Sequence, residues 1–175
     1  MNRKSAVIVM LAVVAVLGSM VIPVFAQDDM KDAPGCRHCG MDRQKFDFSR
    51  MVIHYEDGSS TGVCSLRCAA VELATNIDKT PSAIMAADFD TKTLIDAEKA
   101  FWVLGGSKPG VMSKRGKWAF EKKESAEAFI KANGGTATSF DDAIKAAYTD
   151  LYEDTKMIRE KRKMMKHGQM MEHKH

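Results

Sequence analysis

The chain has 175 residues, of which 45% are hydrophobic and 28% charged, and this composition excludes both a disordered polymer and a protein with many membrane spans. The formal net charge of +3 falls to +1 once Arg3 and Lys4 of the first 26 residues are set aside, which argues against a nucleic-acid binder that relies on bulk charge. The chain is rich in sulfur, with 13 methionines and four cysteines, and this points to a soft metal ion.

Residues 1–26 have the pattern of a secretory signal peptide. Arg3 and Lys4 precede an apolar run from Ala6 to Val21, and Val24-Phe25-Ala26 offers a cleavage site after Ala26. We therefore expect export to the periplasm. The alternative is an uncleaved membrane anchor, because the apolar run approaches the length of about 20 residues that spans a bilayer.

Residues 27–35 are predicted to be a polar linker, and residues 36–135 a metal-binding domain of the α+β class. The domain is expected to contain two strand-strand-helix units. In the first, residues 46–56 and 62–64 form a hairpin around Asp57-Gly58, and a helix follows with Ser65 at its cap. This first unit is expected to resemble a treble clef.

The second unit begins after Pro81. Strands are predicted at residues 84–89, 100–104 and 117–120, followed by a helix over residues 125–132 that stops at Gly134-Gly135. A long amphipathic helix is then predicted within residues 136–163, where Ser139 and Asp142 form a capping box. Its apolar stripe consists of Ile144, Tyr148, Leu151, Thr155 and Ile158. Residues 164–175 are expected to form a disordered tail.

The four cysteines have the spacing of a metal site. Cys36 and Cys39 can face one ion from a tight knuckle, and Cys64 and Cys68 lie one helical turn apart at the start of a helix. A helix N-terminus also favours the thiolate, which is the form that binds metals. The 24 residues between the pairs suffice for the hairpin.

Several kinds of site fit these cysteines. Thiolate and thioether ligands select Cu(I), whereas four cysteines alone can hold a structural Zn(II). Two disulfides in an exported protein are a third possibility. A thiol-disulfide oxidoreductase with Cys36-x-x-Cys39 at its centre is a fourth, although Gly40 would break the helix that such a motif opens.

The methionines favour copper among these possibilities. Met41 follows the knuckle and Met112 follows a glycine-rich turn, so both are candidate thioether ligands. The end of the chain holds further soft donors in a segment too polar to need methionine for packing. Beyond Met157, the auxiliary metal ligands predicted there are Met164, Met165, His167, Met170, Met171, His173 and His175.

Several short segments between Cys36 and Gly135 follow one another in a recognisable order. They are Cys36-x-x-Cys39-Gly40-Met41, Cys64-Ser65-x-x-Cys68-Ala69, residues 100–107 (AFWVLGGS), Met112, Ala119-Phe120 and Ala126-x-x-Phe129. In this order they resemble the NosL family, the copper accessory proteins of nitrous oxide reductase. The first half alone is similar to the TRASH and YHS cysteine modules, which are linked to metal sensing and transport.

The resemblance implies a periplasmic Cu(I) carrier that hands its ion to a copper enzyme and catalyses no reaction itself. It carries ligand roles over to Cys39, Met41 and Met112. The expected partner is a copper-receiving enzyme or a copper transporter, with nitrous oxide reductase as the candidate client. No nucleic acid is expected, and a membrane is expected only if the leader remains uncleaved.

This chain departs from the family pattern in two respects. Family members that serve the reductase are commonly lipoproteins, whereas no lipid-acceptor cysteine follows this apolar run. This chain also has four cysteines and a tail rich in methionine and histidine. Both departures leave copper handling intact, but they make another copper enzyme or a resistance system an alternative client. A zinc-stapled interaction or sensor module is the alternative function.

Overall fold

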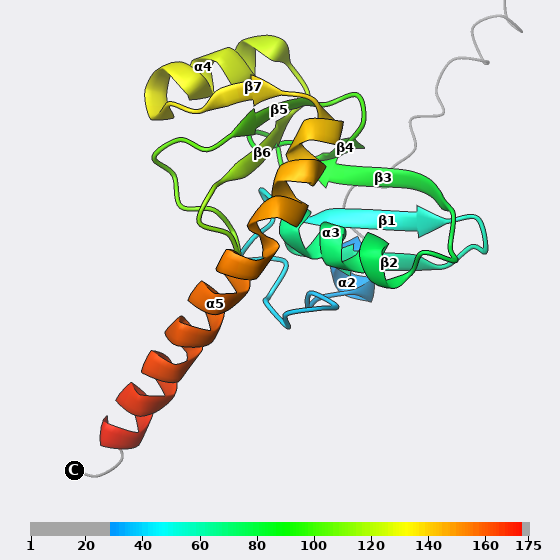
Figure 1. The fold of residues 1–175 in the computed structure, drawn as a ribbon. Coiled ribbons are helices and arrows are strands. Elements are labelled where there is room, and N and C mark those ends of the chain that lie inside the picture. Colours follow the sequence, from blue (N-terminus) through cyan, green and yellow to red (C-terminus); the bar gives the residue numbers. More distant parts are fainter. Residues whose placement is uncertain (1–28, 173–175) are drawn as a thin grey trace, which may run out of the picture.

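The computed structural model describes residues 29–172, and it has the α+β architecture expected from the sequence (Figure 1). The leader in residues 1–26 lies outside the described residues, as do His173 and His175. No helix within residues 29–172 is long and apolar enough to cross a membrane. In chain order the elements are α2 (Asp29–Asp32), β1 (Met51–Tyr55), β2 (Ser60–Val63), α3 (Leu66–Thr75), β3 (Pro81–Ala87), β4 (Leu94–Asp96), β5 (Phe101–Leu104), β6 (Lys117–Phe120), α4 (Lys123–Asn133), β7 (Thr136–Thr138) and α5 (Phe140–Glu172).

The first sheet has the strand order β2-β1-β3-β4, and its β1-β2 hairpin confirms the predicted one. Gly58 adopts a φ of 81° in the turn. The strand predicted at residues 84–89 is β3, and it pairs with β1 instead of joining the second unit as expected. The physical reason is that β1 is buried at four of its five residues, so it needs a hydrogen-bonded neighbour on each side.

The second sheet has the order β6-β5-β7 and carries the predicted helix, here α4. Phe89, Trp118, Phe120 and Phe129 pack together at ring-centroid separations of 5.2 to 6.0 Å and form the core beneath α4. The main chain of Phe89 joins the two sheets, because its N–H donates to the carbonyl of Ala119 (2.8 Å). Strands β4 and β7 span three residues each, too short for a periodic pattern to predict them.

Helix α5 begins where the capping box predicted, and the Asp142 N–H donates to Ser139 Oγ (3.2 Å). Its buried side differs from the predicted stripe. Ala143 and Ala147 lie in the core, whereas Tyr148 is 41% exposed. Small alanines let the helix approach the sheet and α3 closely, so close packing outweighs the burial of larger side chains here.

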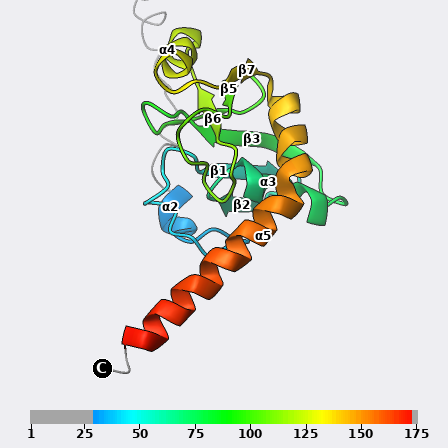
Figure 2. The ribbon, with the colours of Figure 1, turned by 60° about the vertical axis from the view of Figure 1, so that its left-hand side comes forward.

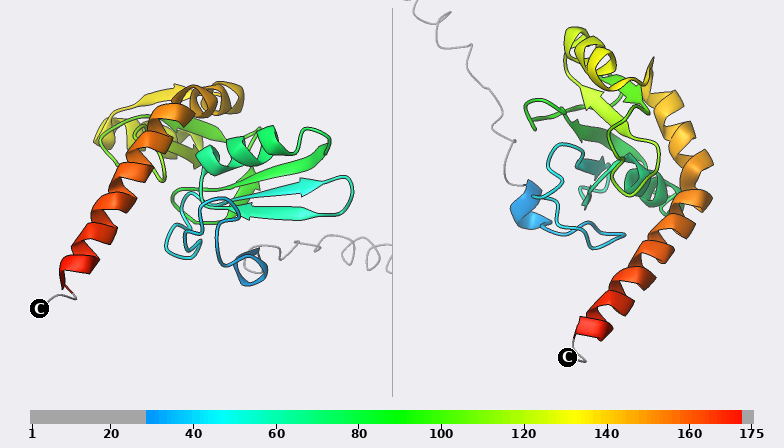
Figure 3. Two further views of the ribbon diagram at one scale, coloured as in Figure 1. Left: turned by 60° about the horizontal axis from the view of Figure 1, so that its bottom comes forward. Right: turned by 90° about the vertical axis from the view of Figure 1, so that its left-hand side faces the viewer.

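The end of α5 also differs from the expected disorder after residue 163, because the helix continues to Glu172. Lysine, arginine, glutamate and methionine, which dominate residues 156–172, are good helix formers and can extend a helix that is already nucleated. With 33 residues, α5 is about 50 Å long. Its second half extends beyond the body in every view (Figures 2 and 3).

The segment predicted as a linker, residues 27–35, is part of the fold over the residues that are described. Helix α2 is held by two buried arginines, because Arg43 and Arg50 both donate to the Asp29 carboxylate (2.7 and 3.1 Å). Arg43 also donates to the carbonyls of Asp29 and Ala33. The chain just before the cysteine knuckle is thus fixed against the first sheet.

Asp29→Asn should lower the free energy of unfolding by about 3 kcal/mol, because it leaves two buried guanidinium groups without their counter-charge. Urea unfolding measures the change. Asp32→Asn, at an exposed position of the same helix, is the control and should leave stability within about 0.5 kcal/mol. Equal stability of the two variants would contradict the proposed anchoring role.

A buried ion pair ties α5 to β6. Asp150 accepts hydrogen bonds from Lys117 (2.9 Å) and Arg115 (2.8 Å), and the Lys117 side chain is only 3% exposed. Burial alone would raise the pKa of Asp150, but the bonds from Arg115 and Lys117 outweigh burial and lower it. The folded pKa therefore lies below the unfolded value of about 3.9, and the ion pair stabilises the fold above that value.

We expect this stabilisation to be lost as the pH falls through the lowered pKa of Asp150. Asp150→Asn should lower the free energy of unfolding at pH 7 by about 2 kcal/mol and should make stability less sensitive to acid. Denaturant unfolding between pH 7 and pH 3 measures both effects, with the exposed Asp90→Asn as control. An unchanged acid dependence in Asp150→Asn would contradict the assignment.

Candidate metal centre

The first two cysteines lie in a tight knuckle that its own backbone closes. The Cys36 N–H donates to the Met41 carbonyl (2.8 Å), and the Gly40 N–H donates to the Cys36 carbonyl (2.9 Å). Gly40 has a φ of 72°, which a residue with a side chain adopts only under strain. Backbone N–H groups of Cys39 and Met41 also bond to the sulfurs of Cys36 and Cys39, respectively. The turn thereby aims both thiols to one side, and no helix starts at Cys36-x-x-Cys39.

The other two cysteines lie at the junction of β2 and α3. Cys64 follows the last residue of β2, and Cys68 lies in the first turn of α3. Ser65 occupies the predicted N-cap position, but its side chain makes no capping hydrogen bond. The hydroxyl of Ser65 instead lies 3.8 Å from the Cys64 sulfur. The junction therefore presents two thiols, one turn apart, to the knuckle.

The four sulfur atoms converge on one point, as the spacing predicted. All four Sγ atoms lie within 4.8 Å of one another, with Cys39 to Cys64 at 3.4 Å and Cys64 to Cys68 at 3.7 Å. A tetrahedral ion with metal–sulfur bonds of about 2.3 Å would separate its ligand sulfurs by about 3.8 Å. A disulfide requires about 2.05 Å, and all four cysteines are free. The cluster has the dimensions of a metal site.

Exposure distinguishes one cysteine from the rest. Cys36, Cys64 and Cys68 are buried, whereas Cys39 is partly exposed. Ligand exchange needs a position that an incoming group can reach. The cluster therefore has one partly exposed cysteine, and it belongs to the knuckle.

Hydrogen bonds among the four thiols lower the pKa of some of them and raise the pKa of the others. Hydrogen bonds from Cys39, Cys64 and Cys68 hold the pKa of Cys36 far below its usual range. The bonds that Cys64 and Cys68 donate to Cys36, together with their burial, raise the pKa of both. Cys36 raises the pKa of Cys39, but bonds from Cys64 and Cys68 outweigh this effect and lower it. The two knuckle cysteines, Cys36 and Cys39, are therefore the ones that favour the thiolate form. A bound ion would displace the thiol protons of Cys64 and Cys68.

A buried carboxylate connects the knuckle to α3. Glu72 follows Cys68 by one helical turn and is 4% exposed. The ring Nε2 of His38, between the knuckle cysteines, lies 2.7 Å from Glu72 Oε2, and the Tyr55 hydroxyl donates to Oε1 (3.0 Å). Burial and then the Glu72 bond raise the pKa of Tyr55. Glu72 therefore holds the knuckle in register with the helix that carries Cys64 and Cys68.

Sequence reasoning missed the role of Glu72. The signal that would have found it is the spacing Cys64, Cys68, Glu72, which places all three residues on one side of the helix. A carboxylate that orients a residue next to metal ligands is a common feature of metal sites. The partner of Glu72 across the cluster, His38, could not be deduced from spacing, because it lies 34 positions away.

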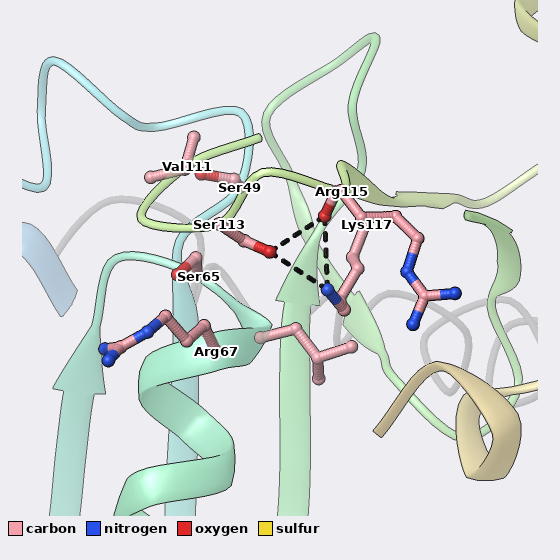
Figure 4. A pocket seen from close by; sticks show the side chains of 8 residues that line it. Ser49, Ser65, Arg67, Val111, Ser113, Arg115 and Lys117 are labelled. Carbon is pink, nitrogen blue, oxygen red and sulfur yellow. Dashed lines mark hydrogen bonds between the residues drawn. The ribbon is translucent and has the colours of Figure 1, made fainter. Parts of the chain in front are cut away.

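The predicted thioether ligands Met41 and Met112 are both partly buried against the core. The backbone of Met41 closes the knuckle. Met112 adopts a φ of 57°, an uncommon conformation for a residue with a side chain. Its neighbours Val111 and Ser113 line a small cavity together with Ser65, so the loop reaches the start of α3 (Figure 4).

This cavity measures about 10 Å³, room for about a single water molecule. It is lined by Ser49, Ser65, Leu66, Arg67, Val111, Ser113, Arg115 and Lys117. Lys117 Nζ donates to Ser113 Oγ (3.1 Å), and the Nε of Arg67 is buried without a partner (Figure 4). The space is too small for an organic substrate.

The predicted auxiliary ligands lie on α5 where they are described. Met157 is partly buried, His167 is exposed, and Met164 and Met165 are 65% and 61% exposed. Met170 and Met171 lie within α5, and His173 and His175 lie outside the described residues. The helix reaches the cluster through one contact, in which Arg162 donates to the carbonyl of Cys39 (3.0 Å).

Comparison with known proteins gives one family and one related fold. The family model described as NosL matches residues 27–148. Among solved structures, the crystal structure of the copper chaperone NosL from Shewanella denitrificans matches with a TM-score of 0.51 and 24% identity, over 61% of this chain and 87% of that chain. This likeness concerns the fold. No curated protein matches the sequence.

Glu72→Gln should weaken metal binding by the cluster about 10- to 100-fold. The amide can accept only through one atom, so it turns an NH₂ group toward either the His38 N–H or the Tyr55 hydroxyl and releases one of them. Competition against a chelator measures the affinity, and Glu56→Gln, at an exposed site, is the control. An affinity equal to that of the control would show that Glu72 does not position the knuckle.

Proposed function

The chain belongs to the NosL family, and on that premise we propose that it is a copper chaperone, which carries one Cu(I) ion as cargo in its four-cysteine cluster. The observation that carries the proposal is the convergence of four free thiols, three of them buried and one accessible. Thiolate ligands select a soft ion such as Cu(I). The copper-chaperone description of the Shewanella denitrificans protein, which shares this fold, supports the same role.

The accessible position of Cys39 suits a carrier. An entering thiolate, thioether or imidazole of a partner can approach the ion from the Cys39 side, form a bond to copper, and let the bond to Cys39 break. Copper remains monovalent throughout, so no electron moves, and a thiolate that is released takes a proton from water. Met41 and Met112 are the proposed weak thioether ligands that hold the ion during this exchange. The protein acts as a carrier and catalyses no reaction.

We place this function in the periplasm, on the evidence of the signal-like residues 1–26. The receiving protein is a copper enzyme or a copper transporter, and nitrous oxide reductase is the candidate client. The four-cysteine cluster of this chain supports the proposed cargo site, whereas the proposed client rests on the family alone.

A zinc-stapled interaction or sensor module is the second candidate, and one observation favours it. Four cysteines with three buried sulfurs resemble closed structural zinc sites. The accessible fourth thiol favours the carrier instead, because a structural site gains nothing from exposure. Metal analysis of protein purified anaerobically under reducing conditions separates copper from zinc.

Cys39→Ser should lower the affinity for Cu(I) by at least about tenfold, because it removes the accessible thiolate. Met41→Ala should cause a smaller loss. Competition against a Cu(I)-specific chelator measures both, and Met85→Ala on β3 controls for the removal of a partly buried methionine away from the knuckle. Unchanged affinity in Cys39→Ser and Met41→Ala would contradict the proposed cargo site, and tight zinc that copper cannot displace would favour the second candidate.

A further inference from the structure

The second half of α5 carries soft metal donors that no part of the core requires. Met164 and Met165 are 65% and 61% exposed, and His167 is exposed. This part of the helix extends away from both sheets (Figures 1 and 3). Methionine stabilises proteins mainly by filling gaps in a core, so packing does not explain these residues. Thioether and imidazole are ligands that suit copper.

Helical geometry places two of these donors beside one another and the third on a different side. Met164 and His167 are three residues apart and are therefore neighbours on the helix surface. Met165 follows Arg162 by three residues and shares its side of the helix. The three donors span less than one turn, about 4.5 Å along the axis. A single monovalent ion can therefore contact more than one of them.

The same stretch of helix touches the accessible end of the cluster. Arg162 donates to the carbonyl of Cys39 (3.0 Å). About two turns earlier, Thr155 accepts from Arg67 of α3 (2.7 Å), so the helix is held along the side that carries the cluster. Met165 is on the side of the helix that carries Arg162, whose side chain reaches the one cysteine that is partly exposed.

We propose that Met164 and His167 form a second, weaker Cu(I) site that captures the ion, and that Met165 then passes it to the cluster through Cys39. The inference rests on the proposed copper-carrying function and adds an entry site to it. In the transfer step the bond between copper and the Met165 sulfur breaks as a bond to the Cys39 sulfur forms. Copper stays monovalent, and any thiol proton is released to water.

Charge gives the transfer its direction. The three donors of the helix site are neutral, and Arg159, Lys161, Arg162, Lys163 and Lys166 surround them with positive charge that opposes the binding of a cation. The cluster offers thiolates, which bind a soft cation more strongly. An ion captured on α5 is therefore more stable in the cluster, and the helix site is emptied for the next ion.

Direct binding can be tested on the full chain by labelling the methionine methyl groups with ¹³C. With up to two equivalents of Cu(I) added under anaerobic conditions, the methyl signals of Met164 and Met165 should shift, each assigned from the variants Met164→Leu and Met165→Leu. The Met85 methyl on β3 is the internal control and should stay in place. If the signals of Met164 and Met165 do not move, the helix site does not exist.

The loading role is tested by a triple variant, Met164→Leu with Met165→Leu and His167→Gln. Its cluster should load from a limiting Cu(I)-chelator complex about tenfold more slowly than the wild type, because it lacks the local capture step. Its equilibrium affinity should be unchanged, because all four cysteines are intact. A matched control, Met85→Leu with His54→Gln, removes the same kinds of donor from the first sheet and should load at the wild-type rate.

The two measurements separate this inference from the proposed function. If the triple variant loads as fast as the control while both bind Cu(I) tightly, the helix site is wrong and the carrier function stands. If the wild type shows no sulfur-to-copper absorption from its cluster, the carrier function is wrong, and the helix inference that depends on it falls as well. Circular dichroism at 222 nm confirms that α5 is intact in each variant.

Discussion

The whole site depends on holding two distant stretches of chain in register, so that four sulfur atoms meet. A knuckle and the start of a helix supply two thiols each, and the buried Glu72 joins them by accepting from His38 and Tyr55. Without that carboxylate the knuckle would lose the side-chain hydrogen bond that joins His38 to α3. A buried carboxylate thus lies where precise spacing of the ligands is needed. Its burial is tolerated because both of its oxygens accept hydrogen bonds.

The same requirement explains why the segment before the knuckle is fixed. Arg43 and Arg50 are fully buried and share the carboxylate of Asp29. Arg43 also bonds to the carbonyls of Met51 and Val63, in the two strands of the hairpin. One side chain therefore connects α2, β1 and β2, and this network fixes the chain just before and just after the knuckle. A knuckle supported from both directions keeps its thiols in place with or without cargo.

The buried cysteines and the partly exposed cysteine have different roles in the cluster. Cys36, Cys64 and Cys68 are buried and give the ion a dry environment, whereas Cys39 faces the surface beside α5. A carrier needs both properties, because it must retain its ion and must also release it by ligand exchange. Helix α5 is bound to β6 through Asp150 and to α3 through Thr155, and its Arg162 donates to the Cys39 carbonyl.

The sequence alone determined the local features: the α+β class, the hairpin, three of the helices, and the four cysteines as one site, because each rests on spacing and periodicity over a few residues. It did not reveal that β3 pairs with β1, that Asp29 is clamped by two arginines, or that Glu72 reaches His38. Those contacts join residues 14 to 35 positions apart in the chain. Only the folded chain decides them, since which distant groups meet depends on the packing of the whole molecule and leaves no periodic pattern.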